Sequence, residues 1–505
     1  MQIQIENGYP YIEFITPELW RIIEKREKEI KVDAGDTVGA GFRSEAILET
    51  CKIFTPFSHV RFQAYRSCCD YLPQDEIYST FVTSFKEDIT NQLKEIGLCQ
   101  LALNKVESCF NEYAKIIKRF LSDKESLGVN FDLGTRNEIK IYEISTPLSD
   151  PHQFGSVRQI TLQNNTKLIY KPRNLLSEKH WQELVCWLVE NGRTRLKSAH
   201  CYCPNDEYGW MEIVKNDTLK KEEDIPEYYI NMGELLFWLW LVGAKDIVRS
   251  NVIACGDKPV LVDCETIFYP QLVENKNNLT STGALPSPQM MIDGSTSNTS
   301  AICLSENNKT VVLLCDCKNI NDLEIKYAKK NPPHAYNIPT FKDKKCYAND
   351  FHHQLKSGFV SAAKFALDKR EEIYSSPLLT EFDLKTRIVL RPTVVYGNTI
   401  LKILEITGRE NSKFCDTVLK DMPFNYSTSS FAKEKLLDIE NSLLSQLIIP
   451  SFYLDNSTKN SITGIQSVFE FFIPGKLAAK QRLKNLDMEE IYNMSNEIYS
   501  SIIQN

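Results

Sequence analysis

The chain has 505 residues, of which 42% are apolar and 25% are charged, the proportions of an ordinary globular protein with two or three domains. Its net charge of −7 argues against a nucleic-acid partner, because phosphate binding usually needs a concentrated basic surface. No apolar run reaches the roughly 18 residues that a membrane span requires. The N-terminus has no basic start followed by an apolar core, so we expect a cytoplasmic protein whose fifteen cysteines are reduced thiols.

The first part of the chain, residues 1–139, is predicted to be mainly helical. Between Phe81 and Leu121 the apolar residues recur mostly at steps of three and four, the period of amphipathic helices. These helices are expected to pack on a neighbouring domain.

A strand hairpin is predicted after this region. Two strand-like runs, Ser156–Gln163 and Lys167–Lys171, flank Asn164 and Asn165, which favour a turn. A hairpin that ends in a lysine can present an ammonium group to the phosphates of a nucleotide. Lys171 is therefore a candidate nucleotide-binding residue.

A short helix is predicted from Glu178 to Glu190, and either Glu183 or Glu190 would pair with Lys171. The following run, 208–214, would form a strand and a hinge between two lobes. Backbone groups there, at Glu212 and Val214, would meet an adenine.

The central stretch, Asp246–Glu265, follows a helix predicted over 228–245. That helix is apolar on all sides, so we expect it to be buried. The central stretch carries Asp246, then Asn251, then Asp263 at the end of a strand-like run. This order and spacing are typical of a phosphoryl-transfer centre, in which one Asp accepts the hydroxyl proton of the acceptor. The Asn and the second Asp hold Mg²⁺ on the phosphates of ATP.

The rest of the chain alternates between loops and helices. Asn275–Ser300 is rich in Asn, Ser, Thr, Gly and Pro, which predicts a long loop or a partly disordered segment. Thr386–Tyr396 resembles a strand with Arg387 and Arg391 on one face. Helices are predicted at 350–372, at 431–447 and from Ala479 to Ile503.

Several motifs follow one another in a recognisable order. They are S-D-P-H-Q-F-G-S-V, Y-K-P-R, Y-G-W-M-E, Y-Y-I-N-M-G-E-L-L, D-I-V-R-S-N-V-I-A-C-G-D-K-P-V-L-V-D-C-E-T-I-F, T-G-A-L-P, R-I-V-L-R-P-T-V-V-Y and a late Q-R-L-K-N-L-D. Over roughly residues 60–505 this set resembles the dehydratase region of class II lanthipeptide synthetases.

The resemblance implies an α+β fold: a bilobal, lipid-kinase-like body with helical N-terminal additions. Its small lobe would span 140–215 and its large lobe, with the elimination elements and C-terminal helices, 216–505. It also implies use of ATP and Mg²⁺ to phosphorylate Ser and Thr of a ribosomal precursor peptide. Elimination of the phosphate would then give dehydroalanine and dehydrobutyrine.

The resemblance also assigns roles to single positions. Asp246 would deprotonate the acceptor hydroxyl, and Asn251, Asp263 and Glu265 would lie at the metal. Arg387 and Thr393 match the residues associated with elimination, and Asp150 and His152 match an acidic–His pair that exchanges protons. Arg391 would serve either step or only pack.

The chain departs from that family in three respects. It stops where the dehydratase region stops, without the zinc-dependent cyclase domain, so a stand-alone dehydratase is expected, with any ring closure left to a separate enzyme. The portion before Asp150 is shorter than in typical members. Val248 and Ser250 stand where the family motif D-x-H-x-E-N has His and Glu.

Two alternatives remain open beside a peptide dehydratase. One is a peptide kinase that stops at the phosphopeptide, which the missing histidine favours. The other is an inactive scaffold that binds the leader of the precursor. No nucleic acid partner is expected for any of the three.

Overall fold

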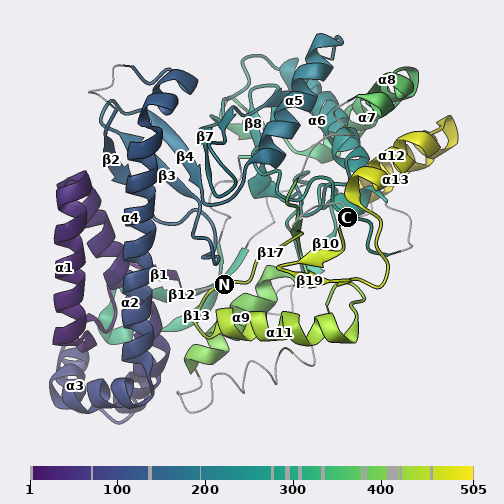
Figure 1. The fold of residues 1–505 in the computed structure, drawn as a ribbon. Helices are drawn as coiled ribbons and strands as arrows, with labels where there is room; N and C mark the ends of the chain where they lie inside the picture. The colour runs from purple at the N-terminus through teal and green to yellow at the C-terminus, as the bar shows by residue number, and fades with distance from the viewer. Residues whose placement is uncertain are drawn as a thin grey trace.

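The computed structural model describes residues 4–69, 72–134, 139–193, 195–273, 278–290, 296–304, 310–330, 336–376, 379, 384–405, 419, 424–454 and 459–503. It contains many helices together with largely antiparallel sheets, which confirms the α+β class. Figure 1 shows the first helices at one side of the molecule and the last helices at the opposite side. The bilobal, lipid-kinase-like arrangement and the domain boundaries at 139 and 215 stay predictions.

Four helices form most of the N-terminal region, as the apolar periodicity predicts. They are α1 (Pro17–Ala34), α2 (Asp36–Arg66), α3 (Ile77–Glu95) and α4 (Leu98–Asn130), preceded by β1 (Gln4–Glu6) and η1 (Ile12–Phe14). The side chain of Thr16 accepts a hydrogen bond from the backbone of Leu19 and Pro17 follows it, which are two common signals for a helix start.

A five-stranded antiparallel sheet packs on these helices. Its order is β2-β3-β4-β7-β6, with bounds Ile141–Ile144, Arg158–Leu162, Lys167–Lys171, Gly209–Glu212 and Cys201–Tyr202 respectively. The predicted hairpin is confirmed, and Asn165 takes the left-handed conformation (φ 63°) that its turn requires. Apolar side chains of the sheet and of α1–α4 belong to one continuous core, so the two parts are not packed independently.

A second core surrounds α6 (Asp224–Leu241), the helix predicted at 228–245. It packs against α7 (His352–Asp368), and both helices approach closely because Gly233 and Gly358 lack side chains at the contact. α5 (Leu176–Glu190), α8 (Arg370–Ser375), α12 (Gly475–Asn485) and α13 (Met488–Ile503) lie around this pair. None of the described helices is long and apolar enough to cross a bilayer.

Short strands follow α6 in the chain. After η2 (Arg249–Asn251), the strands β8 (Val252–Cys255) and β9 (Lys258–Leu261) form a hairpin, and β9 also pairs with β5 (Lys197–Ser198). The interval predicted as a long loop contains η3 (Leu279–Thr282) and a hairpin of β10 (Pro288–Met290) and β11 (Thr296–Asn298). The loop prediction was thus wrong for these residues, and 275–277 and 291–295 lie outside the described part.

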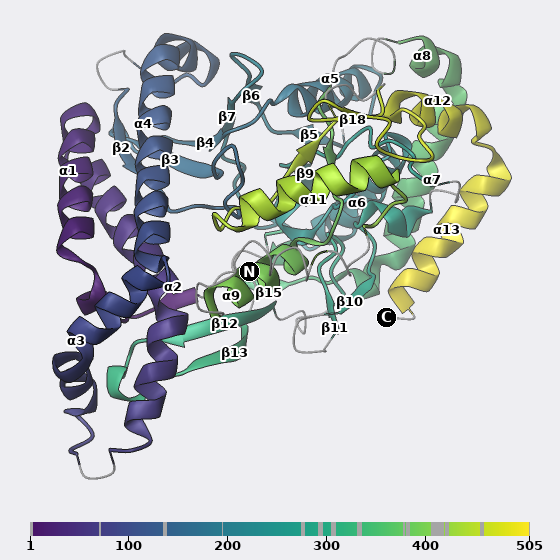
Figure 2. The same ribbon diagram turned by 60° about the horizontal axis from the view of Figure 1, so that its bottom comes forward.

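A long hairpin reaches back to the N-terminal region, as Figure 2 shows. It consists of β12 (Thr310–Asp316) and β13 (Ile325–Lys330), joined through η4 (Ile320–Asp322), and β12 pairs in parallel with β1. The remaining small elements are β14 (Thr340–Phe341), β15 (Lys344–Lys345) and η5 (Ala348–Phe351).

The strand predicted for Thr386–Tyr396 is mostly wrong. Only β16 (Arg387–Ile388) is extended, and it pairs with β17 (Phe452–Tyr453), whereas Thr393 begins helix α9 (Thr393–Glu405). α11 (Ser430–Leu444) lies beside α9, followed by the hairpin of β18 (Ser461–Ile462) and β19 (Ile465–Gln466).

Candidate functional site

The central stretch forms a turn and a hairpin that bring its polar residues to one end. α6 stops at Leu241, and Asp246 follows in a left-handed conformation with φ 54°. Asn251 accepts a backbone hydrogen bond from Val262 (2.9 Å), which continues the β8–β9 pairing and sets Asn251 beside Asp263. The amide and the carboxylate therefore lie at the same open end of one hairpin.

Lys171, the last residue of β4, lies in this same place. Its ammonium group contacts Glu178 at 3.1 Å, the backbone oxygen of Val262 at 2.7 Å and the carboxylate of Asp263 at 3.5 Å. The acidic partner on α5 is thus Glu178 and not Glu183 or Glu190. Glu178 lies in the first turn of α5, which is the end of that helix nearest the strand.

Arg173 joins the cluster although sequence reasoning assigned it no role. Its guanidinium contacts Glu178 and Asp263 at 2.5 Å each, and Glu265 at 3.3 Å. The signal was its spacing, because a residue two positions after Lys171 in an extended segment points to the same side. Pro172 between them favours that extended backbone.

The charges around Asp263 keep its carboxyl ionised. Burial alone would raise the pKa of Asp263, but attraction by Lys171, Arg173 and Arg387 outweighs burial and lowers the pKa to about 2. The carboxylate is therefore anionic throughout the physiological range and remains about one-third exposed.

Glu265 connects this group to a second one. One carboxylate oxygen pairs with Arg387, and the other accepts a hydrogen bond from the hydroxyl of Tyr453 at 3.0 Å and pairs with Arg173. Both oxygens are thus engaged by protein groups. Tyr453 was not among the predicted site residues, and its only sequence signal was its place in the I-P-S-F-Y run.

His152 lies within electrostatic range of Arg387. Its Nδ1 lies 3.1 Å from the backbone oxygen of Ile449 and 3.2 Å from the hydroxyl of Ser451. Burial lowers the pKa of His152 and the positive charge of Arg387 lowers it further, while the hydrogen bond to Ile449 and the charges of Glu265 and Asp150 act in the opposite direction. The balance of these effects favours the neutral imidazole.

Asp150, two residues earlier, is exposed to solvent. In the described part of the chain no hydrogen bond joins its carboxylate to His152. Its effect on the histidine is the weak electrostatic one named above.

Asp246 has the carboxyl whose pKa suits proton transfer near neutral pH. Its side chain reaches solvent, yet surrounding protein displaces enough water for burial to raise its pKa to about 6. Arg387 opposes this rise, and Glu265 and Asp263 add to it. The backbone oxygen of Asp246 accepts a hydrogen bond from the Asn251 amide at 3.1 Å.

The other predicted positions lie at the margins of this cluster. Glu212 uses its backbone N–H and its carboxylate to bind the backbone of His200, and Val214 packs on a small apolar group between the sheet and β9. Thr393 is partly buried at the start of α9 and has no hydrogen bond to the cluster within the described residues. Arg391 is buried, pairs with Glu440 at 2.9 Å and lies over the ring of Phe424.

The donor set fits magnesium better than zinc. Among the residues that the structure describes, no group of three or more His, Cys, Asp or Glu side chains is arranged to hold a metal ion by itself. Magnesium is commonly held by one or two carboxylates together with phosphate oxygens and water. Asp263 and the amide of Asn251 could supply that part of a magnesium shell.

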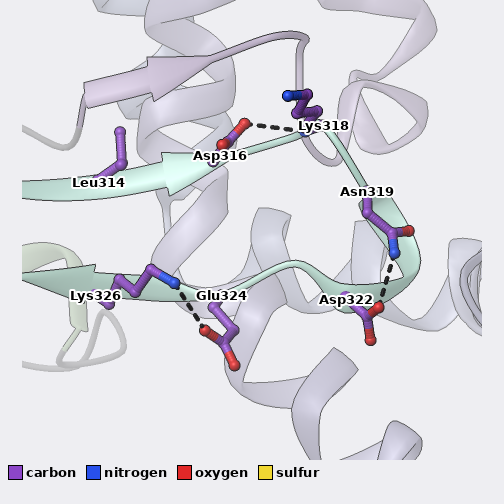
Figure 3. Close-up of a pocket in the computed structure, with 7 residues that line it drawn as sticks. All are labelled: Leu314, Asp316, Lys318, Asn319, Asp322, Glu324 and Lys326. Carbon is purple, nitrogen blue, oxygen red and sulfur yellow. Dashed lines mark hydrogen bonds and ion pairs between the residues drawn. The ribbon is translucent and has the colours of Figure 1, made fainter. Parts of the chain in front are cut away.

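One pocket of about 190 Å³ lies elsewhere, at the turn between β12 and β13 (Figure 3). It is lined by Leu314, Asp316, Lys318, Asn319, Asp322, Glu324 and Lys326. Several of these polar groups bond to one another, including Lys326 to Glu324 and Asn319 to Asp322. None of the lining residues belongs to the cluster around Asp263, so the pocket is separate from it.

Comparison with known proteins gives two matches. Over 328 residues the chain is 24% identical to a protein of Lactococcus lactis subsp. lactis described as lacticin 481/lactococcin biosynthesis protein LcnDR2. That match covers 58% of this chain and 34% of the relative, so the chain spans about a third of the relative's length. Residues 97–455 match the model of a family described as a domain of unknown function, DUF4135. This interval is more than half of the chain and includes the whole cluster from His152 to Tyr453, so the protein belongs to the DUF4135 family.

Proposed function

We propose that this protein dehydrates Ser and Thr residues of a ribosomally made precursor peptide, by phosphorylation and subsequent elimination of phosphate. Its similarity to a lacticin 481 biosynthesis protein supports this class of substrate. The observation that carries the proposal is the link through Glu265, which places the Lys171–Asp263 group and the His152–Arg387 group in one cluster.

The first group suits phosphoryl transfer. ATP would supply the phosphoryl group, and magnesium would neutralise its charge, held by Asp263 and Asn251. Asp246, whose pKa of about 6 leaves it mostly ionised at pH 7, would accept the proton of the attacking hydroxyl. Lys171 would contribute positive charge beside the phosphates.

The second group suits elimination. A base removes the proton on Cα of the phosphorylated residue, the Cα–Cβ double bond forms, and the Cβ–O bond breaks as phosphate leaves with its electron pair. Because the Ile449 oxygen can only accept, Nδ1 of His152 carries the hydrogen and Nε2 keeps a lone pair that could take a proton. Arg387 would bind the leaving phosphate through its guanidinium fork.

A peptide kinase that stops at the phosphopeptide is the second candidate. Val248 stands where a histidine is expected, and its backbone bridges to Ser300 while its side chain offers no proton. If elimination depends on that histidine, the substitution by Val248 favours the kinase over the dehydratase.

The test uses the peptide encoded by a short Ser/Thr-rich reading frame beside the gene, incubated with the protein and Mg·ATP. Loss of water from the peptide mass supports the dehydratase, gain of phosphate supports the kinase, and an unchanged mass contradicts both.

Arg387→Gln should leave phosphorylated peptide behind, because it removes the cation that faces the leaving group and keeps the transfer residues. Arg26→Gln is the matched control, since Arg26 pairs with Glu29 and Glu107 on the N-terminal helices. Normal dehydration by Arg387→Gln would show that Arg387 has no part in elimination.

A further inference from the structure

Arg173 lies at the centre of three carboxylates. One terminal nitrogen contacts both Glu178 and Asp263 at 2.5 Å, the other contacts Glu178 at 3.0 Å, and Nε contacts Glu265 at 3.3 Å. The side chain is only 11% exposed, so these contacts are largely shielded from water.

The guanidinium thereby occupies the position of a bound cation. Three carboxylates converge from α5 and from the segment after β9, and Lys171 reaches only two of them, Glu178 and Asp263. Without Arg173 the carboxylates would repel one another, because like charges at short range in a partly dry site are costly.

A divalent cation at Asp263 would have to share this place. The carboxylate oxygen of Asp263 that contacts Arg173 also faces Lys171, so two positive groups already neutralise it. A metal ion and a guanidinium on one carboxylate repel each other, and the effect is large at such distances.

We propose that Arg173 is a positioning residue that takes the place of the metal ion at Asp263 and withdraws when the nucleotide arrives. This inference rests on the proposed function, which requires a divalent cation at that carboxylate. A guanidinium fork matches phosphate oxygens as well as carboxylates, so Arg173 can exchange Asp263 for the incoming phosphates. Magnesium alone then binds weakly at Asp263, because Arg173 competes with it, and magnesium together with a nucleotide binds more tightly.

The test measures magnesium binding without nucleotide or peptide. The unfolding midpoint of the full chain is followed against MgCl2 concentration for the unaltered protein and for Arg173→Gln. The variant should be less stable without metal, and magnesium should stabilise it at concentrations lower by on the order of tenfold or more, because one competing charge has gone.

Arg193→Gln is the matched control. Arg193 pairs at 2.6 Å with Glu234, a fully buried residue of α6 that makes no contact with the Asp263 cluster among the described residues. This variant should also lose stability, but its response to MgCl2 should equal that of the unaltered protein.

An equal or weaker magnesium response in Arg173→Gln would overturn the inference. Should that variant fail to fold, Arg173→Lys is measured instead, since an ammonium lacks the fork of three nitrogens through which Arg173 contacts Asp263, Glu178 and Glu265. Its response should shift in the same direction by a smaller amount, and no shift would equally overturn the inference. The measurement needs neither ATP turnover nor a precursor, so it succeeds or fails independently of the dehydration assay.

Discussion

Asp246 is held in place mainly through its backbone. Its left-handed conformation is stabilised by Val248, whose N–H donates to the Asp246 oxygen at 3.0 Å, and by the amide of Asn251 at the same oxygen. Its carboxyl is thus left available to a substrate, and its pKa is raised mainly by burial and adjusted by the charges of Arg387, Glu265 and Asp263.

The pH dependence of phosphoryl transfer should reflect this carboxyl. The ionised form is the base, and its pKa is about 6, so the initial rate of phosphopeptide formation should rise as pH increases through about 6. Arg387 lowers the pKa of Asp246, so Arg387→Gln should move this rise to higher pH. The measurement is phosphate incorporation from pH 5 to 8 by both proteins, and an unchanged profile would exclude Asp246 as the titrating base.

At the scale of elements, the turn of the T-G-A-L-P motif supports the same residue. The oxygen of Thr282 accepts a hydrogen bond from the N–H of Ile247 at 3.0 Å, and Gly283, with φ 80°, lies against that backbone. A Cβ at Gly283 would lie 3.0 Å from the Ile247 nitrogen and 3.4 Å from the Cα of Asp246. The motif therefore fixes the backbone from which the Asp246 carboxyl projects.

Gly283→Ala should slow phosphoryl transfer by moving Asp246. The control is Gly256→Ala in the β8–β9 turn, where φ is also positive (60°) but no atom lies within 4 Å of the added Cβ. Each variant should lose roughly 1–2 kcal/mol of stability from the strained backbone, and only Gly283→Ala should lower kcat strongly. Equal kcat values, measured beside thermal unfolding, would argue against a positioning role.

Sequence patterns predicted those elements whose periodicity was long. Helices α5, α6, α7 and α11 and the β3–β4 hairpin lie within a few residues of their predicted bounds, and the region of α3 and α4 is helical as its period predicts. The strand prediction for Thr386–Tyr396 is mostly wrong because it rests on β-branched residues, several of which here lie in helix α9. Its buried apolar residues Tyr396, Ile400 and Ile403 repeat at helical spacing, which predicts the helix that follows Pro392.

The site was predictable in part for a different reason. Lys171 and Asp263 stood out because each ends a strand-like run, and the structure places them 3.5 Å apart. Contacts between residues that are far apart in the sequence have no such signal. Arg173 with Glu265, and Glu265 with Tyr453, come together only through the tertiary fold.

At the scale of the whole molecule, one buried network joins the N-terminal helices to the sheet. Arg158 of β3 is fully buried and contacts Glu45 of α2 through two nitrogens at 2.7 Å each, and Glu112 of α4 at 2.9 Å. The hydroxyl of Tyr113 donates to Glu45 at 3.0 Å. Two helices and a strand are thus held together by a single guanidinium.

Arg158→Met should destabilise the whole protein by roughly 3–5 kcal/mol, because it leaves Glu45 buried without its cation. Changing Glu45 to Met as well should restore much of the loss, since the unpaired charge is removed. Denaturant unfolding of the single and double variants measures both values. A double variant no more stable than the single one would attribute the loss to packing instead of charge.

The parallel pairing of β1 with β12 has a consequence for biosynthesis. Ile5 lies opposite Cys315, Asn7 donates to Asp316 at 2.7 Å, and Glu6 pairs with Lys330. At roughly 5–20 residues per second, a ribosome needs about 15–60 s to reach β12 after it has made β1. The first strand of the nascent chain therefore waits without its partner, so a fragment that ends before β12 cannot complete this sheet.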